Sequence, residues 1–134
     1  MLALWTPEVF DRLPDRIRDD LLSALHYGTG ERSFEDLVQE CRDGEKQIWM
    51  HTVGDKFNAT VITQISLFPG KKTCEILYLG GDTVLEHLGD IKEIEDFARE
   101  QGCHDIQAIG RPGWVRAMRA VGYEQRYSVT GKIL

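Results

Sequence analysis

The part of this sequence that most constrains its fold is the stretch of residues 71–110. It contains an apolar, strand-like segment at 73–79, a glycine pair, a helical pattern and a second short apolar segment at 105–109. A strand, a crossover helix and another strand predict a βαβ unit with two parallel strands. In such a unit a phosphate-bearing ligand binds between the first strand and the helix, because unpaired helix N–H groups point there.

Bulk properties limit the classes of protein that this chain can belong to. A length of 134 residues predicts a single domain over 1–134 with a sizeable core. The formal net charge of −6 argues against general nucleic-acid or acidic-membrane binding. No apolar run reaches membrane length, so we expect no membrane association and a cytoplasmic protein.

The cysteines carry no disulfide or zinc signature. Cys41, Cys74 and Cys103 are odd in number, widely spaced and form no C-x-x-C pair. This pattern predicts small, mostly buried side chains in a reducing compartment.

The first half of the chain predicts helices and then a meander of strands. Residues 1–5 favour a short strand, and apolar residues at helical spacing follow over 7–25, Leu13 among them, with a break or kink expected at Pro14. Ser33 begins a Ser-x-x-Asp capping box. Strand patterns at 47–53, 57–67 and 73–79 are separated by short turns, which predicts an antiparallel meander.

The second half predicts two more helices and terminal strands. Asp90 and Glu93 have the spacing of a capping box for the crossover helix, and Gly102 is placed to end it. A short helix should open at Pro112 and close at Gly122. Residues 123–134 are expected to form one or two strands.

This order of elements, with one segment in particular, resembles a known superfamily. Residues 113–123 read Gly-Trp-Val-Arg-Ala-Met-Arg-Ala-Val-Gly-Tyr, similar to the short helix ending in Gly-Phe or Gly-Tyr near the end of GNAT N-acetyltransferases. Arg111-Pro-Gly-Trp114 together with Gly122-Tyr-Glu124 also resembles small GNAT-like proteins of tailed bacteriophages and prophages. The resemblance implies an α/β fold with a mixed, mostly antiparallel sheet and helices on both faces. For a phage-encoded protein it implies the host cytoplasm or the virion as location.

The resemblance also implies a site for acetyl-CoA. In the superfamily the pantetheine arm lies between two splayed parallel strands, here expected to diverge just beyond Leu79. The cofactor-binding residues implied are Leu77, Tyr78, Leu79, Gly80 and Gly81, with Arg116 and Arg119 at the 3′-phosphate.

The turn after the glycines departs from the superfamily. Residues 80–90 lack the basic phosphate loop and carry Asp82, Glu86 and Asp90. We expect these carboxylates to cap the following helix, each repelling a diphosphate by about 1 kcal/mol in water-like surroundings.

Catalytic roles follow from the same resemblance. Glu75, on the fourth strand, matches the position of a base that activates the amine. From its alternation along the strand we interpret it as solvent-facing, on one face with Leu77 and Leu79. The superfamily's acid is often a tyrosine at the position of Met118 here. Tyr123 and Tyr127 are the remaining candidates for that acid.

Other residue clusters suggest partners rather than metals. The four histidines show no ligand spacing, so no metal site is expected. Arg111, Arg116, Arg119 and Arg126 gather near Trp114 in an otherwise acidic chain. The segment around Arg111, Trp114 and Arg116 is therefore a candidate contact for an acidic protein partner.

Two functions of different classes remain open from the sequence. One is an acyl-CoA-dependent N-acetyltransferase acting on a small amine or a protein amine, with acetyl-CoA as cofactor. The other is a catalytically inactive GNAT-fold domain that binds a partner or associates with a phage virion. Either form could oligomerise through a strand edge.

Overall fold

The computed structural model describes residues 1–12 and 14–134, so Leu13 of the predicted helix lies outside the described residues. The elements are, in order, β1 (Leu2–Trp5), α1 (Val9–Arg12), α2 (Pro14–Leu25), α3 (Phe34–Arg42), β2 (Lys46–Val53), β3 (Lys56–Leu67), β4 (Lys72–Gly81), the 3₁₀ helix η1 (Val84–Ile91), α4 (Lys92–Glu100), β5 (Asp105–Ala108), α5 (Pro112–Met118) and the 3₁₀ turn η2 (Arg119–Val121). None of the helices in this described part is long and apolar enough to cross a membrane.

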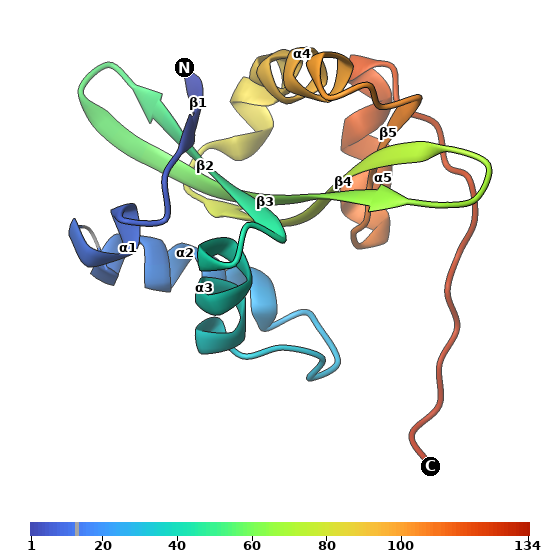
Figure 1. Cartoon of the computed structure of the whole chain (residues 1–134), viewed down its shortest axis with the longest axis horizontal. Coiled ribbons are helices and arrows are strands. Elements are labelled where there is room, and N and C mark those ends of the chain that lie inside the picture. The colour runs from blue at the N-terminus through green and yellow to red at the C-terminus, as the bar shows by residue number, and fades with distance from the viewer. Residues whose placement is uncertain (13) are drawn as a thin grey trace.

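One mixed sheet forms the middle layer of the molecule. The described strands have the order β1-β2-β3-β4-β5, antiparallel throughout except for the parallel pair β4–β5. Figure 1 shows α4 above this sheet and α1, α2 and α3 below it. The predicted βαβ unit, the antiparallel meander and the helices on both faces are therefore confirmed.

Two apolar clusters hold the helices on opposite faces of the sheet. Ile17 and Leu21 of α2 pack with Ile48 of β2 and Ile62 of β3 on one face. On the other face Ile94 of α4 packs into a cluster with strand residues and with buried Met118 of α5. Burial of apolar side chains such as these is the main favourable contribution to folding, at roughly 25 cal/mol per Å² of apolar surface removed from water.

Local signals explain several of the helix ends. Ser33 and Asp36 form the predicted reciprocal capping box of α3. Gly102 and Gly122 have left-handed φ values of 77° and 91° and end the last two helical segments as predicted. The break expected at Pro14 stays a prediction, because Leu13, the residue between α1 and α2, lies outside the described residues.

Two predictions about elements are wrong. Asp90 does not cap α4, whose N-cap is Ile91 without a side-chain hydrogen bond. Residues 123–134, all of them described, form no strand and leave the body of the molecule at the lower right of Figure 1. A strand pattern forms a ladder only where a neighbouring strand is available to pair with it.

Candidate active site

A notch opens where the parallel strands β4 and β5 part. The strands pair from Thr73 and Asp105 up to Ile76 and Ala108, and β4 then continues to Gly81 paired with β3 alone. Divergence therefore begins three residues before the predicted point beyond Leu79. Beyond Ile76, the backbone groups of β4 that face away from β3 have no β5 partner.

A bulge in β4 is the physical cause of this early divergence. On β3 the neighbours Ile62 and Thr63 pair with Tyr78 and Ile76, so that Leu77 has no partner in the ladder. An extra residue bends a strand and increases its local twist. The bulge turns the end of β4 away from β5.

The same bulge changes which side chains share a face. Leu79 packs with the cluster on the α4 face, to which Cys74 and Ile76 belong, whereas Tyr78 packs on the α2 face. Glu75, which alternates with Cys74 and Ile76, therefore lies on the side of Tyr78. The expectation that it shares a face with Leu79 is wrong, because simple alternation fails across a bulge.

Glu75 is buried, which corrects its interpretation as a solvent-facing residue. Only 8% of it is exposed. Its Oε2 accepts a hydrogen bond of 2.9 Å from Nε2 of Gln107 on β5, and its Oε1 accepts one from the Ser66 hydroxyl. Both oxygens of the carboxylate are thus occupied by protein donors.

The notch leads into a long groove with a volume of about 1740 Å³. Its floor is β4 from Ile76 to Gly81, and its walls come from the loop after α2, from η1, from α5 and from the segment after Gly122. Glu75 does not line the groove, but its partner Gln107 does. Ligand sites are concave surfaces of this kind, although pockets for small molecules are usually smaller, at about 300–1,000 Å³.

The glycine pair lies in the strand and has a packing reason at each position. A Cβ on Gly80 would lie 1.9 Å from the backbone oxygen of Asp20 in α2. A Cβ on Gly81 would lie 2.3 Å from the backbone oxygen of Asn58 in β3. The absence of a side chain at both positions lets α2 and β3 approach β4 closely.

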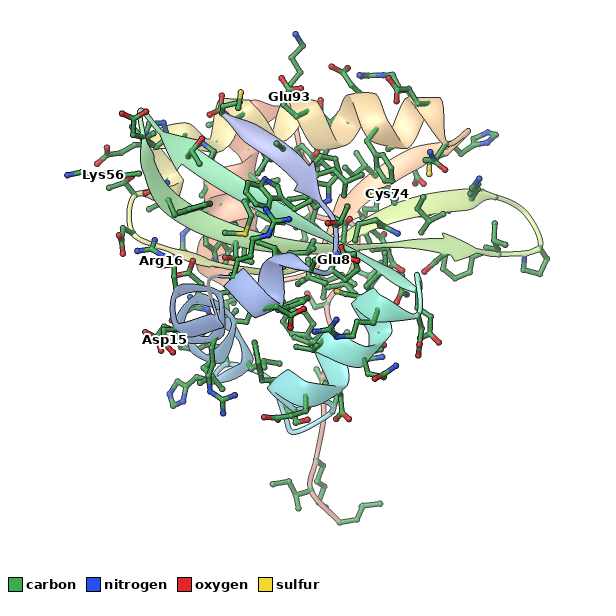
Figure 2. The ribbon with its side chains drawn as sticks, turned by 60° about the vertical axis from the view of Figure 1, so that its left-hand side comes forward. Glu8, Asp15, Arg16, Lys56, Cys74 and Glu93 are labelled. Carbon is green, nitrogen blue, oxygen red and sulfur yellow. The ribbon has the colours of Figure 1, made fainter. Side chains whose placement is uncertain are left out.

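The acidic turn after β4 does not cap a helix, and two of its carboxylates, Asp82 and Asp90, have side-chain partners. Arg16 reaches from α2 to this turn, where its Nη1 lies 3.3 Å from Asp82 Oδ2 and its Nη2 donates to the Asn58 carbonyl at 2.7 Å (Figure 2). Asp90 Oδ2 lies 2.7 Å from Nε2 of buried His51. The hydrogen bond from His51 lowers the pKa of Asp90. The guanidinium of Arg16 therefore offsets part of the repulsion expected between Asp82 and a diphosphate, whereas the lowered pKa keeps Asp90 ionised.

The structure brings together His51, His87 and Asp90, a cluster that the spacing of these residues in the sequence did not predict. Within the described residues their ligand atoms all lie within 4.8 Å of one another. The side-chain amide of Asn58 determines which nitrogen of His51 carries the proton. Oδ1 of Asn58 accepts a hydrogen bond from Thr83 N–H at 3.1 Å, so Nδ2 of Asn58 is the atom that lies 3.0 Å from His51 Nδ1. Nδ1 of His51 is therefore an acceptor, and its Nε2–H donates to Asp90.

This arrangement fits a hydrogen-bonded link better than a metal centre. A histidine that binds a metal through Nε2 needs an acceptor for its Nδ1–H, and here an amide donor occupies that place. Two of the three cysteines offer no alternative ligand or nucleophile, since burial raises the pKa of Cys41 to about 11 and that of Cys74 to about 12. Cys74 lies between the sheet and α4 (Figure 2).

Comparison with solved structures identifies the fold. A probable acetyltransferase matches with a TM-score of 0.73 at 11% identity, covering 100% of this chain and 96% of its own. A GNAT family acetyltransferase of Staphylococcus aureus matches with a TM-score of 0.68 at 16% identity, and the match covers 100% of this chain and 98% of that one. The fold is that of the GNAT acetyltransferases. A predicted acetyltransferase of Clostridium acetobutylicum, in a structure with acetyl-CoA, matches with a TM-score of 0.69 at 11% identity. This match covers 99% of this chain and 95% of that one. No protein-family model and no curated protein matches the sequence.

Within this GNAT fold the two tyrosine candidates have different surroundings. The Tyr123 hydroxyl donates to Oε2 of Glu95 on α4 at 2.8 Å. Burial, reinforced by Glu95, raises the pKa of Tyr123 well above its ordinary value. Tyr127 lines the groove and is 65% exposed. Met118 is buried in the core on the α4 face.

The arginines that cluster in sequence all line the groove, but their contacts differ. Arg116 and Arg119 are exposed and line the groove from α5 and η2. The Arg111 guanidinium carbon lies 3.5 Å from the centre of the Tyr27 ring, which joins the start of α5 to the loop after α2 across the groove. Arg126 instead lies 2.6 Å from Asp105 of β5.

Proposed function

We propose that this protein is an acyl-CoA-dependent N-acetyltransferase that binds acetyl-CoA in the notch between β4 and β5. The observation that carries the proposal is the divergence of these two parallel strands at the Leu77 bulge, above a groove continuous with α5. Strand backbone without a neighbour can pair with an extended amide-containing chain, which is the chemistry of pantetheine. Leu77, Tyr78 and Leu79 would contact that arm.

The nucleotide end would lie against η1 and α5. We assign the 3′-phosphate to Arg116 and Arg119, since arginine offers paired donors to phosphate. The pairing of Asp82 with Arg16 supports this assignment, because Asp82 lines the groove and the guanidinium offsets its negative charge. The diphosphate would contact backbone N–H groups near Gly80 and Gly81.

The transfer would consist of attack by an amine on the thioester. Glu75 is the proposed base, and a substrate amine that displaced the Gln107 amide would reach its Oε2. Tyr123 is the first candidate for the acid that protonates the CoA thiolate. Its raised pKa keeps the phenol protonated at neutral pH, although its proton is directed to Glu95. Tyr127, exposed in the groove, is the second candidate.

Binding of acetyl-CoA tests the first part of this proposal. Thermal unfolding in the presence of acetyl-CoA should give a higher midpoint, because a ligand of the folded state adds about 2.7 kcal/mol of stability at a hundredfold excess over Kd. The double change Arg116→Ala and Arg119→Ala should reduce the shift, and 3′-dephospho-CoA should bind alike to both proteins. Arg12→Ala, an exposed arginine on α1, is the matched control. No shift with millimolar ligand would contradict the proposal.

A GNAT-fold domain without catalysis is the second candidate, favoured by Met118 at the position of the superfamily's tyrosine and by the Tyr123–Glu95 bond. Its partner would contact the segment around Arg111, Trp114 and Arg116. The resemblance of residues 111–124 to phage proteins is the reason to consider a virion component. Release of free CoA in the presence of a panel of amines, abolished in Glu75→Gln, would favour the transferase. Binding of CoA without any release would favour this second function.

A further inference from the structure

A row of polar side chains crosses the face of the sheet that α2 and α3 cover. Its four members are direct partners across β2, β3, β4 and β5, namely Lys46, Gln64, Glu75 and Gln107. Directly paired residues point to the same face of a sheet. Lys46 is 4% exposed and forms its ion pair with Glu40 of α3. In the described part of the chain no cation pairs with Glu75, so its negative charge is held by neutral hydrogen-bond donors.

The donors to Glu75 include an ordered chain with Ser66 at its centre. A carboxylate has no proton to give, so the contact between Ser66 Oγ and Glu75 Oε1 uses the one proton of the hydroxyl. Ser66 Oγ can then only accept from Gln64, whose Nε2 lies 3.0 Å away. Gln64 and Ser66 are two residues apart on β3 and share a face of the sheet. The direction of bonding is thus fixed from Gln64 through Ser66 to Glu75.

The two oxygens of Glu75 have donors in different surroundings. Oε2 accepts from Gln107, which lines the groove. Oε1 accepts from Ser66, and neither Ser66 nor Gln64 is among the described residues that line the groove. An amine that displaced Gln107, as in the proposed transfer, would therefore leave Ser66 as the side-chain donor to Glu75.

We propose that Ser66 is a positioning residue for Glu75, a role that rests on the proposed transferase function. With Oε1 bonded to Ser66, the carboxylate is held against rotation when Gln107 leaves, and Oε2 stays directed toward the groove. In the step itself an N–H bond of the substrate ammonium breaks and an O–H bond forms at Oε2, which frees the nitrogen lone pair to attack the thioester. A hydrogen bond to an ionised oxygen is roughly twice as strong as one between neutral groups, so Ser66 also favours the ionised Glu75 that acts as the base.

The pH profile of kcat/KM tests this role, with the amine that gives the fastest release of CoA as substrate. Ser66→Ala should lower kcat/KM at neutral pH by about tenfold and move its acid limb to higher pH by roughly half a unit or more, because the ionised base loses a donor. Ser66→Thr keeps the hydroxyl and should restore both. Thr52→Ala is the control, since it removes a hydroxyl of β2 that lies 3.5 Å from the Met1 carbonyl oxygen, and its profile should match that of the native protein. The thermal shift with acetyl-CoA should be equal in all four proteins.

A second variant separates positioning from general damage to the strand. Gln64→Leu leaves the Ser66 hydroxyl in place and removes the donor that directs it, so the acid limb should move in the same direction but less far. Because Ser66 and Gln64 are only half-buried, these variants should fold like the native protein, which circular dichroism checks.

The outcomes distinguish this role from the transferase function itself. A loss of kcat/KM that is equal at every pH, with the acid limb in place, would mean that Ser66 acts only in the structure and would overturn the proposal. An unchanged profile in Ser66→Ala would also overturn it. Both results leave the transferase function standing, because the native protein still releases CoA. A native protein that releases no CoA with any amine overturns the transferase function, and this role with it.

Discussion

Asn58 illustrates how one residue connects several parts of this fold. Between His51 and Thr52 of β2 the register with β3 shifts, and Asn58 is left without a ladder partner. Its backbone oxygen is then free to accept from Arg16 and from Asp82 N–H, while its side chain joins His51 to Thr83. A bulge thus links α2, β2 and the turn after β4 through one amide side chain and one carbonyl.

Gly80 should be required for packing more than for phosphate. Gly80→Ala places a Cβ against the Asp20 backbone, which has no flexible end to move aside, so we expect a loss of about 1–3 kcal/mol or more in the free energy of unfolding. Urea titration measures this loss. Gly89→Ala, where no atom lies within 4 Å of the added Cβ, should change stability by less than about 0.5 kcal/mol. A Gly80→Ala protein of native stability that no longer bound acetyl-CoA would reverse this interpretation.

Asp105 should make the free energy of unfolding vary with pH in the acidic range. Hydrogen bonds from Lys71, Thr73 and Arg126 hold the pKa of Asp105 well below its ordinary value of 3.8. A depressed carboxyl pKa stabilises the fold above the ordinary value, and this contribution is lost as the pH falls through the folded-state pKa. Asp105→Asn should therefore cost about 1 kcal/mol at neutral pH, for a pair close to the surface.

Measurement of unfolding at several pH values checks this sign. The stability difference between native protein and Asp105→Asn should shrink steadily once the pH drops below about 4. Asp55→Asn, in the exposed turn between β2 and β3, serves as the control. A difference that stayed constant, or grew, toward acid would contradict the role assigned to Asp105.

At the scale of elements, η1 owes its position to side-chain links as much as to packing. Its buried Leu88 and Ile91 face the core, while His87 has non-helical φ and ψ values of −124° and 22° and interrupts it. The His51–Asp90 bond ties its end to β2. An element with an internal interruption depends on such links for its order, because its own backbone ladder is incomplete.

Asp90→Ala should loosen this element. The change leaves the Nε2–H of buried His51 without its acceptor, which costs about 1–3 kcal/mol. Amides of η1 should exchange faster with solvent, while those of β2 and β3 change little. Glu86→Ala, exposed on the same element, is the control and should leave exchange unaltered. Equal exchange rates in native protein and Asp90→Ala would show that packing alone holds η1.

At the scale of the whole molecule, the sheet separates two apolar clusters. The helices α1–α3 cover one face, and η1, α4 and α5 cover the other. The groove lies where this covering is interrupted, between the loop after α2 and the segment after Gly122. A ligand in the notch would fill this interruption.

Local chemistry in the sequence was sufficient to predict the order of elements up to Gly122, the parallel β4–β5 pair and the glycines that end α4 and η2. These features depend on periodicity, turn residues and capping, which act within a few residues. The capping box at Ser33 was found for the same reason. Asp82 lies in the turn after β4 as expected, but Asp90 lies in η1, and neither the lack of capping nor the partners of the two acids were predicted.

Only the tertiary structure decided the details of the site. The bulge at Leu77 places Glu75 and Leu79 on opposite faces of the sheet. The register shift between β2 and β3 leaves Asn58 without a ladder partner. Neither follows from the sequence, because register depends on neighbouring strands. The partners Arg16 of Asp82 and His51 of Asp90 lie far away in sequence and meet them only in the folded chain. Residues 123–134 show the same dependence, since a strand pattern becomes a strand only when an open edge meets it.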